Sequence, residues 1–452
     1  MEYIENGKSY YFADANRFEY SDDNHFTVIV GKNGTGKSRL LEAIISTLFE
    51  DKVPQEYFIR DYGSRFRKQL NSNLIVDREP KKVIAVSTSP FDRFPLIRHN
   101  YSMNRYKYLG LRGLPSRNLG LAYMARIMNS LIESIINDSE RASIVADVLN
   151  YLGYSDSIEA RFHLAPTVRG MEDILQSKNP EKALCDYFMK PTMGPYSSNS
   201  SVSMELTIEN IQRALIAFSR VMNSTTKPRF DVEISRGGIQ IVGGTYYIDE
   251  DFVFLVQSGI ARLRDVTFIK NGMKERLRIN DASSGEQSVV MSLLGIASQI
   301  EDNCLICIDE PEVCLHPEWQ EKYIELLTST FNMYKGCQFL IATHSPQIIS
   351  NLDTENCYIM PMDTGIAVSA VDFVNKSADF QLVNVFKSPG FRNEYLSRIA
   401  LNVFTKVSKR KKFDDIDLTY LSVLEGVFDL IDEEDPIHGL VIAIKEMYVE
   451  YA

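Results

Sequence analysis

The chain has 452 residues, of which 44% are hydrophobic and 24% are charged, a composition typical of soluble globular proteins. Its formal net charge of −11 opposes nonspecific attraction to nucleic acid, although a local basic groove could still bind it. No apolar run approaches the ~20 residues of a membrane-spanning helix, and the polar, acidic N-terminus differs from a signal peptide. We therefore expect a cytoplasmic protein without a membrane partner.

The first predicted elements are a strand, a glycine-rich loop and a helix. Residues 26–30 form an apolar, β-rich run that leads directly into the loop over residues 31–38. Residues 39–49 then have the Leu and Ile spacing of a helix. This order is the context that a phosphate-binding P-loop requires. Another buried strand is predicted over residues 83–88.

The next part of the chain, from about residue 100 to 225, is predicted to be a helical insertion. Four segments have amphipathic spacing: residues 119–136, 142–152, 171–189 and 206–222. A loop rich in Ser, Asn and Gly separates the last two. Heptads are not sustained over many turns, so we expect no long coiled-coil arm.

Strands are predicted to return after residue 226. Two hairpins are expected, one pairing residues 230–234 with 239–242 and the other pairing 266–269 with 274–279, with a helix near 252–262 between them. A helix over residues 287–300 follows. Residues 304–308 and 338–343 are then expected as parallel strands around a helix over 318–331. From about residue 375 the pattern is helical again. We read Cys304 and Cys307, which form a C-x-x-C within an apolar strand, as reduced core thiols.

The glycine-rich loop has the complete G-x-x-x-x-G-K-S spacing of a P-loop. In such a loop, glycines let backbone amides turn toward phosphate oxygens at the positive end of the following helix. The Lys is expected to reach the β- and γ-phosphates of ATP, and the Ser hydroxyl to bind Mg²⁺. The candidate nucleotide-binding residues here are Gly31, Asn33, Gly34, Thr35, Gly36, Lys37, Ser38 and Arg39.

Acidic and imidazole side chains follow two later predicted strands. Asp309 and Glu310 come directly after the strand over 304–308, and His344 follows the strand over 338–343. Open α/β sheets bind ligands at the carboxyl ends of their strands. Asp309 is therefore the second candidate Mg²⁺ ligand, and Glu310 is the candidate that orients the attacking water. His344 could hydrogen-bond the γ-phosphate.

A third segment begins a predicted helix shortly before Asp309. Ser283, Ser284, Gly285 and Glu286 stand at this helix start, where hydroxyl and N–H groups can bind an anion. This segment lies one helix and one strand ahead of Asp309. That order, together with His344, makes the group of motifs a specific indicator of a nucleotide site. We include all four among the candidate nucleotide-binding residues.

Together these motifs resemble the SMC-like, RecF-like branch of ABC-type ATPases and the overlapping OLD-type ATPases. The motifs are G-x-N-G-x-G-K-S, S-S-G-E-Q, I-D-E-P-E-x-x-L-H-P and T-H-S-P-Q, and the resemblance covers about residues 1–95 and 226–350. It implies that Ser283 and Gly285 contact the γ-phosphate held by the P-loop of a second copy. It also implies that residues 312–316 form the D-loop between two sites. The S-S-G-E-Q motif corresponds to the signature motif of ABC-type ATPases. Ala282 and Ser284 replace the Leu and the first Gly that are usual in that motif.

The resemblance implies an α/β ABC-type P-loop ATPase with a large helical insertion and a helical C-terminal tail. Its expected parts are residues 1–95 with the P-loop, the insertion 96–225, the signature and strand-end part 226–370, and the tail 371–452. No arrangement typical of a Toprim nuclease follows His344, so we expect no nuclease activity of its own. The chain resembles the stand-alone ATPase subunit of antiphage modules, such as PtuA of Septu and retron cassettes or AriA of PARIS.

The expected partners are a second copy of the chain and a separate effector, most plausibly a nuclease. Two alternatives remain open: an ATPase that clamps DNA directly, as in DNA repair, and an ATP-dependent scaffold that holds or inhibits a toxin. Basic and aromatic residues could bind DNA or RNA, or form a solvated rim. They are Arg93, Arg98, His99, Tyr101, Arg105, Tyr106, Lys107, Tyr108, Arg112 and Arg117, with a second group at Arg60, Arg65, Arg67 and Lys68.

Overall fold

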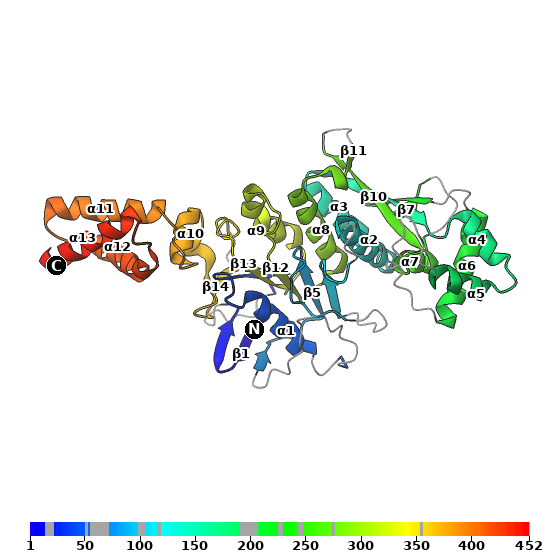
Figure 1. The fold of residues 1–452 in the computed structure, drawn as a ribbon, viewed down its shortest axis with the longest axis horizontal. Coiled ribbons are helices and arrows are strands. Elements are labelled where there is room, and N and C mark those ends of the chain that lie inside the picture. Colours follow the sequence, from blue (N-terminus) through cyan, green and yellow to red (C-terminus); the bar gives the residue numbers. More distant parts are fainter. Residues whose placement is uncertain are drawn as a thin grey trace. The chain divides into compact units, whose positions relative to one another are not determined.

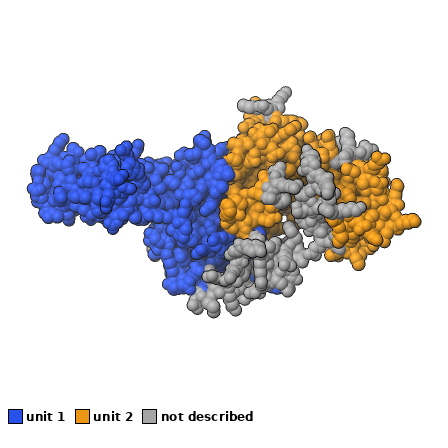
Figure 2. Space-filling view, viewed as in Figure 1, with its two compact units in different colours: residues 1–81, 93–96, 302–452 blue, residues 82–92, 97–301 orange. Residues whose placement is uncertain are grey.

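Figure 1 shows the computed structural model of the chain, and Figure 2 shows its two compact units. The structure describes residues 1–13, 22–49, 53–54, 72–97, 105–114, 119–189, 207–224, 229–242, 248–272, 276–352 and 356–451. Unit 1 comprises residues 1–81, 93–96 and 302–452, and unit 2 comprises residues 82–92 and 97–301. The predicted part 226–370 is divided between the two units.

The core of unit 1 is a mostly parallel sheet. Its strands lie in the order β15 (Val368–Ser369), β14 (Cys357–Pro361), β3 (His25–Val30), β13 (Gln338–Thr343) and β12 (Cys304–Asp309), with β15 antiparallel to the rest. Val30 pairs with Thr343, and Ala342 pairs with Asp309. The carboxyl ends of β3, β13 and β12 therefore meet at one edge of the sheet.

Two helices cover this sheet, α1 (Lys37–Phe49) below and α9 (Pro317–Phe331) above in the view of Figure 1. Their apolar stripes face the strands, as the spacing of Leu and Ile predicts. In the core, the ring of Phe339 on β13 stacks on Phe26 of β3 at 4.4 Å and on Phe331 of α9 at 6.1 Å. A small antiparallel sheet, β2 (Lys8–Tyr11), β1 (Glu2–Glu5) and β4 (Ser72–Ile75), completes this part of unit 1.

Unit 2 is built on a five-stranded antiparallel sheet. Its order is β11 (Arg276–Arg278), β10 (Ala261–Lys270), β7 (Tyr154–Leu164), β8 (Arg229–Ser235) and β9 (Gly238–Ile241). Both predicted hairpins are confirmed, as β8–β9 and β10–β11. The unit also holds the parallel pair β5 (Lys82–Ser87) and β6 (Tyr106–Leu109). Its helices are α2 (Leu119–Asn137), α3 (Arg141–Tyr151), α4 (Val168–Leu175), α5 (Pro180–Met189), α6 (Ile208–Ser224), α7 (Glu250–Gln257) and α8 (Ser284–Gln299).

Three details of the predicted insertion and its surroundings were wrong. Residues 171–189 form two helices rather than one, because Pro180 begins α5 after a turn and has the fixed φ that suits a first helical position. The helix expected near 252–262 ends at Gln257, since Gly259 has a φ of +76° that terminates it before β10 begins. Strands β6 and β7 were not predicted, although the buried residues of β7 alternate at Ile158, Ala160, Phe162 and Leu164.

Helix α2 has the length and apolar composition that would allow it to cross a membrane, which is true of no other helix in the described part of the chain. The prediction that no apolar run approaches this length was therefore too strict. Within unit 2, α2 packs against α8, and residues such as Ile127, Met128 and Leu131 are fully buried there. Burial in the core of the unit accounts for its apolar character.

The C-terminal segment is helical, as expected. It contains α10 (Ala378–Asn384), α11 (Glu394–Arg410), α12 (Asp415–Gly426) and α13 (Pro436–Tyr451), and the last three share an apolar core. The basic run that ends α11 is partly paired with acidic residues, since Lys406 binds Asp414 and Asp417. Many of the apolar residues of these helices therefore pack against one another in this shared core.

We expect Leu424→Ala to loosen the C-terminal helices by about 2–5 kcal/mol, because a fully buried leucine leaves a cavity when it is truncated. Leu424 is 0% exposed in the core between α11, α12 and α13. Leu401→Ala on α11 is the matched control: Leu401 is 55% exposed, and we expect a change within about 0.5 kcal/mol. Hydrogen exchange of the amides of α11 and α13 measures both, and equal effects would contradict this packing.

Candidate nucleotide site

The P-loop joins β3 to α1, and its backbone needs glycine at defined positions. Gly34 has a φ of +81° and Gly36 a φ of +98°, conformations that L side chains rarely adopt. At Gly31 an added Cβ would lie 2.8 Å from Thr35 Oγ1. The Thr35 hydroxyl donates to the Lys32 carbonyl at 2.9 Å and closes the turn. The loop geometry thus explains the glycine pattern seen in the sequence.

Lys37 lies inside this loop and is 6% exposed. Its Nζ donates to the carbonyl oxygens of Gly31 at 2.8 Å and Lys32 at 3.2 Å. Burial lowers the pKa of its ammonium group, and the negative charges of Glu312, Glu310 and Asp309 oppose that shift. The ammonium is therefore held at the loop by two backbone carbonyls, in a position where phosphate oxygens could replace them.

Ser38 and Asp309 meet although 271 positions separate them in the chain. The Ser38 hydroxyl donates to Asp309 Oδ1 at 2.9 Å. Asp309 ends β12 and is 2% exposed. A hydroxyl and a carboxylate oxygen are ligands that Mg²⁺ prefers, with waters and phosphates completing its coordination. These two residues fit the metal that the motifs imply.

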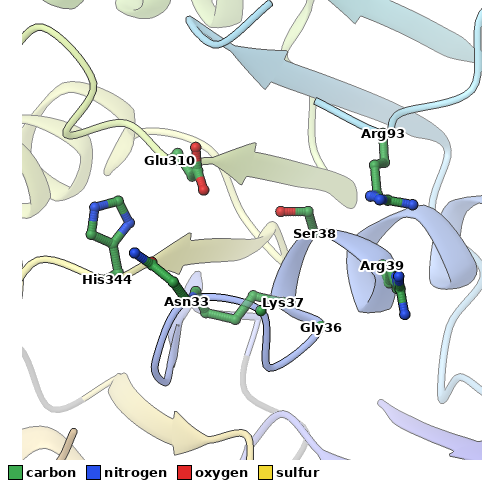
Figure 3. A pocket seen from close by; sticks show the side chains of 9 residues that line it. Asn33, Gly36, Lys37, Ser38, Arg39, Arg93, Glu310 and His344 are labelled. Carbon is green, nitrogen blue, oxygen red and sulfur yellow. The ribbon is translucent and has the colours of Figure 1, made fainter. Parts of the chain in front are cut away.

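A cavity of about 310 Å³ opens beside these groups, within unit 1. Figure 3 shows its lining, in which Glu310 and His344 stand across from the P-loop and α1. The cavity is lined by Asn33, Gly34, Gly36, Lys37, Ser38, Arg39, Arg93, Glu310 and His344. This volume is within the range of small-ligand sites. All of these except Arg93 were predicted as site residues from the sequence.

The segment after Asp309 turns sharply. Glu310 has a φ of +51°, and its amide donates to the Ala342 carbonyl of β13 at 2.9 Å. Glu312, two residues on, is buried, and its Oε1 accepts from the Thr343 hydroxyl at 2.8 Å and the His344 amide at 2.7 Å. His344 Nδ1 lies 3.0 Å from the same oxygen. The sequence placed Glu312 only in an expected D-loop, and its contact with His344 was missed.

Arg93 lines the cavity and was not predicted as a nucleotide-site residue. In the sequence it was grouped only with possible nucleic-acid contacts, and no signal there singles it out. Of that group, Arg98, His99, Tyr101, Arg117 and the cluster at 60–68 lie outside the described residues. Tyr108 and Arg112 bind Asp92 within unit 2, at 2.6 Å and 3.3 Å. Those two side chains belong to an internal network.

The signature residues lie in unit 2, at the start of α8. Ser283 caps this helix and accepts from the Glu286 amide at 3.2 Å; Ser283 and Ser284 are exposed, whereas Gly285 is buried. The Glu286 carboxylate accepts from the Tyr154 hydroxyl and lies 3.4 Å from Lys270 Nζ. Burial and this carboxylate raise the pKa of Tyr154. The predicted contact of residues 283–286 with the nucleotide of a second copy stays a prediction.

The buried cysteines fit the interpretation made from the sequence. Cys304 and Cys307 are both buried in β12 and neither forms a disulfide. Burial is the main cause that raises the pKa of the Cys307 thiol. Within the described ranges, no group of three or more His, Cys, Asp or Glu side chains is placed to hold a metal ion.

The P-loop, the strand-end carboxylates and the parallel sheet define the fold of an α/β P-loop ATPase. Residues 123–350, just over half of the chain, match the family described as "AAA domain, putative AbiEii toxin, Type IV TA system", and the chain belongs to this family. Residues 3–107 match a second family, described as "AAA domain".

Two curated relatives are retron ATPases. The "Retron Ec83 probable ATPase" of Escherichia coli is 22% identical over 391 residues, which cover 76% of this chain and 68% of that protein. The "Retron Vc95 probable ATPase" of Vibrio cholerae serotype O1 biovar El Tor is 31% identical over 107 residues, covering 21% of this chain and 20% of that protein. The predicted resemblance to the ATPases of defence modules is confirmed.

Solved structures also align with the chain. An ATP-binding cassette of an ABC transporter, MJ1267 in its ADP conformation, aligns with a TM-score of 0.23 and 12% identity, covering 77% of this chain and 80% of that one. An SMC head bound to the C-terminal winged-helix domain of ScpA aligns with a TM-score of 0.26 and 14% identity, covering 76% of this chain and 90% of that one.

Proposed function

We propose that the chain binds ATP with Mg²⁺ and hydrolyses it to ADP and phosphate. The observation that carries this proposal is the 2.9 Å bond between Ser38 and Asp309, beside a cavity that Lys37, Glu310 and His344 also line. The Ser38 hydroxyl, the Lys37 ammonium group and the carboxylates of Asp309 and Glu310 therefore lie at or beside the same cavity. This is the set of groups that P-loop phosphoryl transfer uses.

Each side chain has a distinct task in this reaction. Lys37 exchanges its carbonyl partners for β- and γ-phosphate oxygens, and the amides of the glycine loop bind the same phosphates. Ser38 and Asp309 would hold Mg²⁺, which when bound neutralises phosphate charge. Glu310 orients a water and accepts its proton. The water oxygen forms a bond to the γ-phosphorus while the bond from that phosphorus to the ADP oxygen breaks. His344 donates to an oxygen of the transferred phosphoryl group.

We expect Glu310→Gln to lower kcat for ATP hydrolysis by roughly 100- to 10,000-fold while ATP still binds, because an amide cannot polarise or deprotonate water. Lys37→Ala should instead lose ATP binding. Glu318→Gln is the matched control, since Glu318 lies nearby in an exposed first turn of α9 and pairs with Lys322 at 3.0 Å. Phosphate release and nucleotide binding measure these effects. Full turnover by the Glu310 variant would contradict its proposed role.

We further propose that two chains close head-to-tail over ATP. Residues 283 and 284 expose hydroxyl groups at the N-terminus of a 16-residue helix, where backbone amides and the helix dipole favour an anion. The resemblance of the S-S-G-E-Q motif to ABC signatures supports its use by a second copy. Bound ATP would then join the P-loop of one copy to the signature of the other.

Ser283→Asp tests this closure with little disturbance of the helix. Asp caps helices as well as Ser does, but its negative charge would repel a phosphate. We expect ATP to bind normally while the ATP-dependent dimer of the Glu310→Gln protein is lost, as measured by sedimentation. Ser377→Asp, at the cap of α10, adds the same charge elsewhere and should leave the dimer intact. Persistence of the dimer in the Ser283 variant would contradict the proposed contact.

We also propose that this ATP-driven closure regulates a separate effector, most plausibly a nuclease of an antiphage module. Its support is the similarity to retron ATPases and a family description that refers to a toxin–antitoxin system. The C-terminal helices provide a candidate docking region. A DNA clamp would instead show hydrolysis stimulated by DNA, and a scaffold would show ATP-dependent assembly without turnover.

We expect a protein encoded beside this chain to co-purify with it when both are expressed together. Its effector activity should differ between complexes of the wild type and of Glu310→Gln, because the closed state would persist in the variant. The Leu401→Ala protein serves as a control for a remote surface change. If no neighbouring product binds, or if its activity is the same with every variant, the regulatory proposal fails.

A further inference from the structure

Glu312 accepts two hydrogen bonds through a single carboxylate oxygen, and a ring nitrogen of His344 lies within ion-pair distance of the same oxygen. Its Oε1 accepts from the Thr343 hydroxyl at 2.8 Å and from the His344 amide at 2.7 Å, and His344 Nδ1 lies 3.0 Å away. Its side chain is 5% exposed, whereas that of His344 is 41% exposed. The carboxylate is therefore fixed in the protein, and the imidazole that it holds borders the cavity.

This geometry determines which ring nitrogen of His344 is available to a ligand. The carboxylate oxygen only accepts hydrogen bonds, so Nδ1 must carry the proton that is shared with Glu312. Nε2 is then the nitrogen left for another partner. A carboxylate that binds one nitrogen of a functional histidine sets its tautomer and ring orientation.

The surrounding chain makes the contact rigid. The backbone turns through Glu310 at a φ of +51°, Pro311 follows, and Cys314 has a φ of +67°. On the other side, the Thr343 hydroxyl that donates to Glu312 also accepts from the Ser345 amide at 3.0 Å. Glu312 thus links the ends of β12 and β13. Its negative charge also acts on Lys37 and opposes the lowering of the lysine's pKa.

We propose that Glu312 is a positioning residue that orients His344 toward the terminal phosphate of ATP. This inference rests on the proposed function, since it assigns a partner to a residue of that same site. Glu312 does not touch the phosphate itself. It acts by holding Nδ1, so that Nε2 can donate to the phosphoryl oxygen as the γ-phosphate is transferred.

Glu312→Gln tests the proposal, because the amide keeps the side-chain shape and one acceptor oxygen but loses the charge. We expect kcat to fall by roughly tenfold or more, the size found when carboxylate partners of functional histidines are removed. KM should change little, because the lost interaction strengthens in the transition state. Glu318→Gln, an exposed change on the following helix, should alter neither constant.

Two further readouts separate positioning from a merely structural role. The ¹⁵N resonances of His344, assigned with His344→Ala, should show a shift of its tautomer or charge state in Glu312→Gln, while the other histidines report an intact fold. In a His344→Ala background, Glu312→Gln should cause little further loss of kcat. An unchanged His344 spectrum, unchanged kcat, or fully additive losses would overturn the proposal. If the wild type hydrolyses no ATP, the proposed function fails, while the NMR comparison still decides whether Glu312 orients the ring.

Discussion

The hydrogen bond between Ser38 and Asp309 is the contact on which the site depends. It joins the start of α1 to the end of β12, two segments that the chain separates by 271 positions. The contact is possible because β3, β13 and β12 are parallel and in register at their carboxyl ends. Parallel pairing therefore gathers the P-loop, the acidic strand end and the histidine at one edge of the sheet.

The charges at this edge are arranged around Lys37. Three carboxylates, those of Asp309, Glu310 and Glu312, oppose the loss of its proton, while burial favours that loss. In the described part of the chain, the ammonium donates to two carbonyls of its own loop. A triphosphate would offer charged acceptors instead, and hydrogen bonds to charged groups are the stronger ones. The fold thus places the Lys37 ammonium where the phosphate oxygens of a bound triphosphate would be its strongest hydrogen-bond acceptors.

Residues whose role follows from local pattern were predictable from the sequence. The glycine spacing around Lys37 predicts a P-loop, and the apolar run before Asp309 predicts a buried strand, each from a few neighbouring residues. The folded chain places both segments beside one cavity. The contact of Glu312 was missed because it joins residues 31 and 32 positions apart in the chain, and Arg93 was missed because only the fold places it beside the P-loop cavity. Strand β7 was missed because helical segments flank it, which obscured its period-two burial.

The most direct measurement is an experimental structure of the Glu310→Gln protein with ATP and Mg²⁺. The account predicts a triphosphate in the P-loop, Mg²⁺ bound through Ser38 and Asp309, and residues 283–285 of a second copy against the γ-phosphate. A bound triphosphate with those residues remote from it in every copy would contradict the account. So would a metal ion held by other side chains.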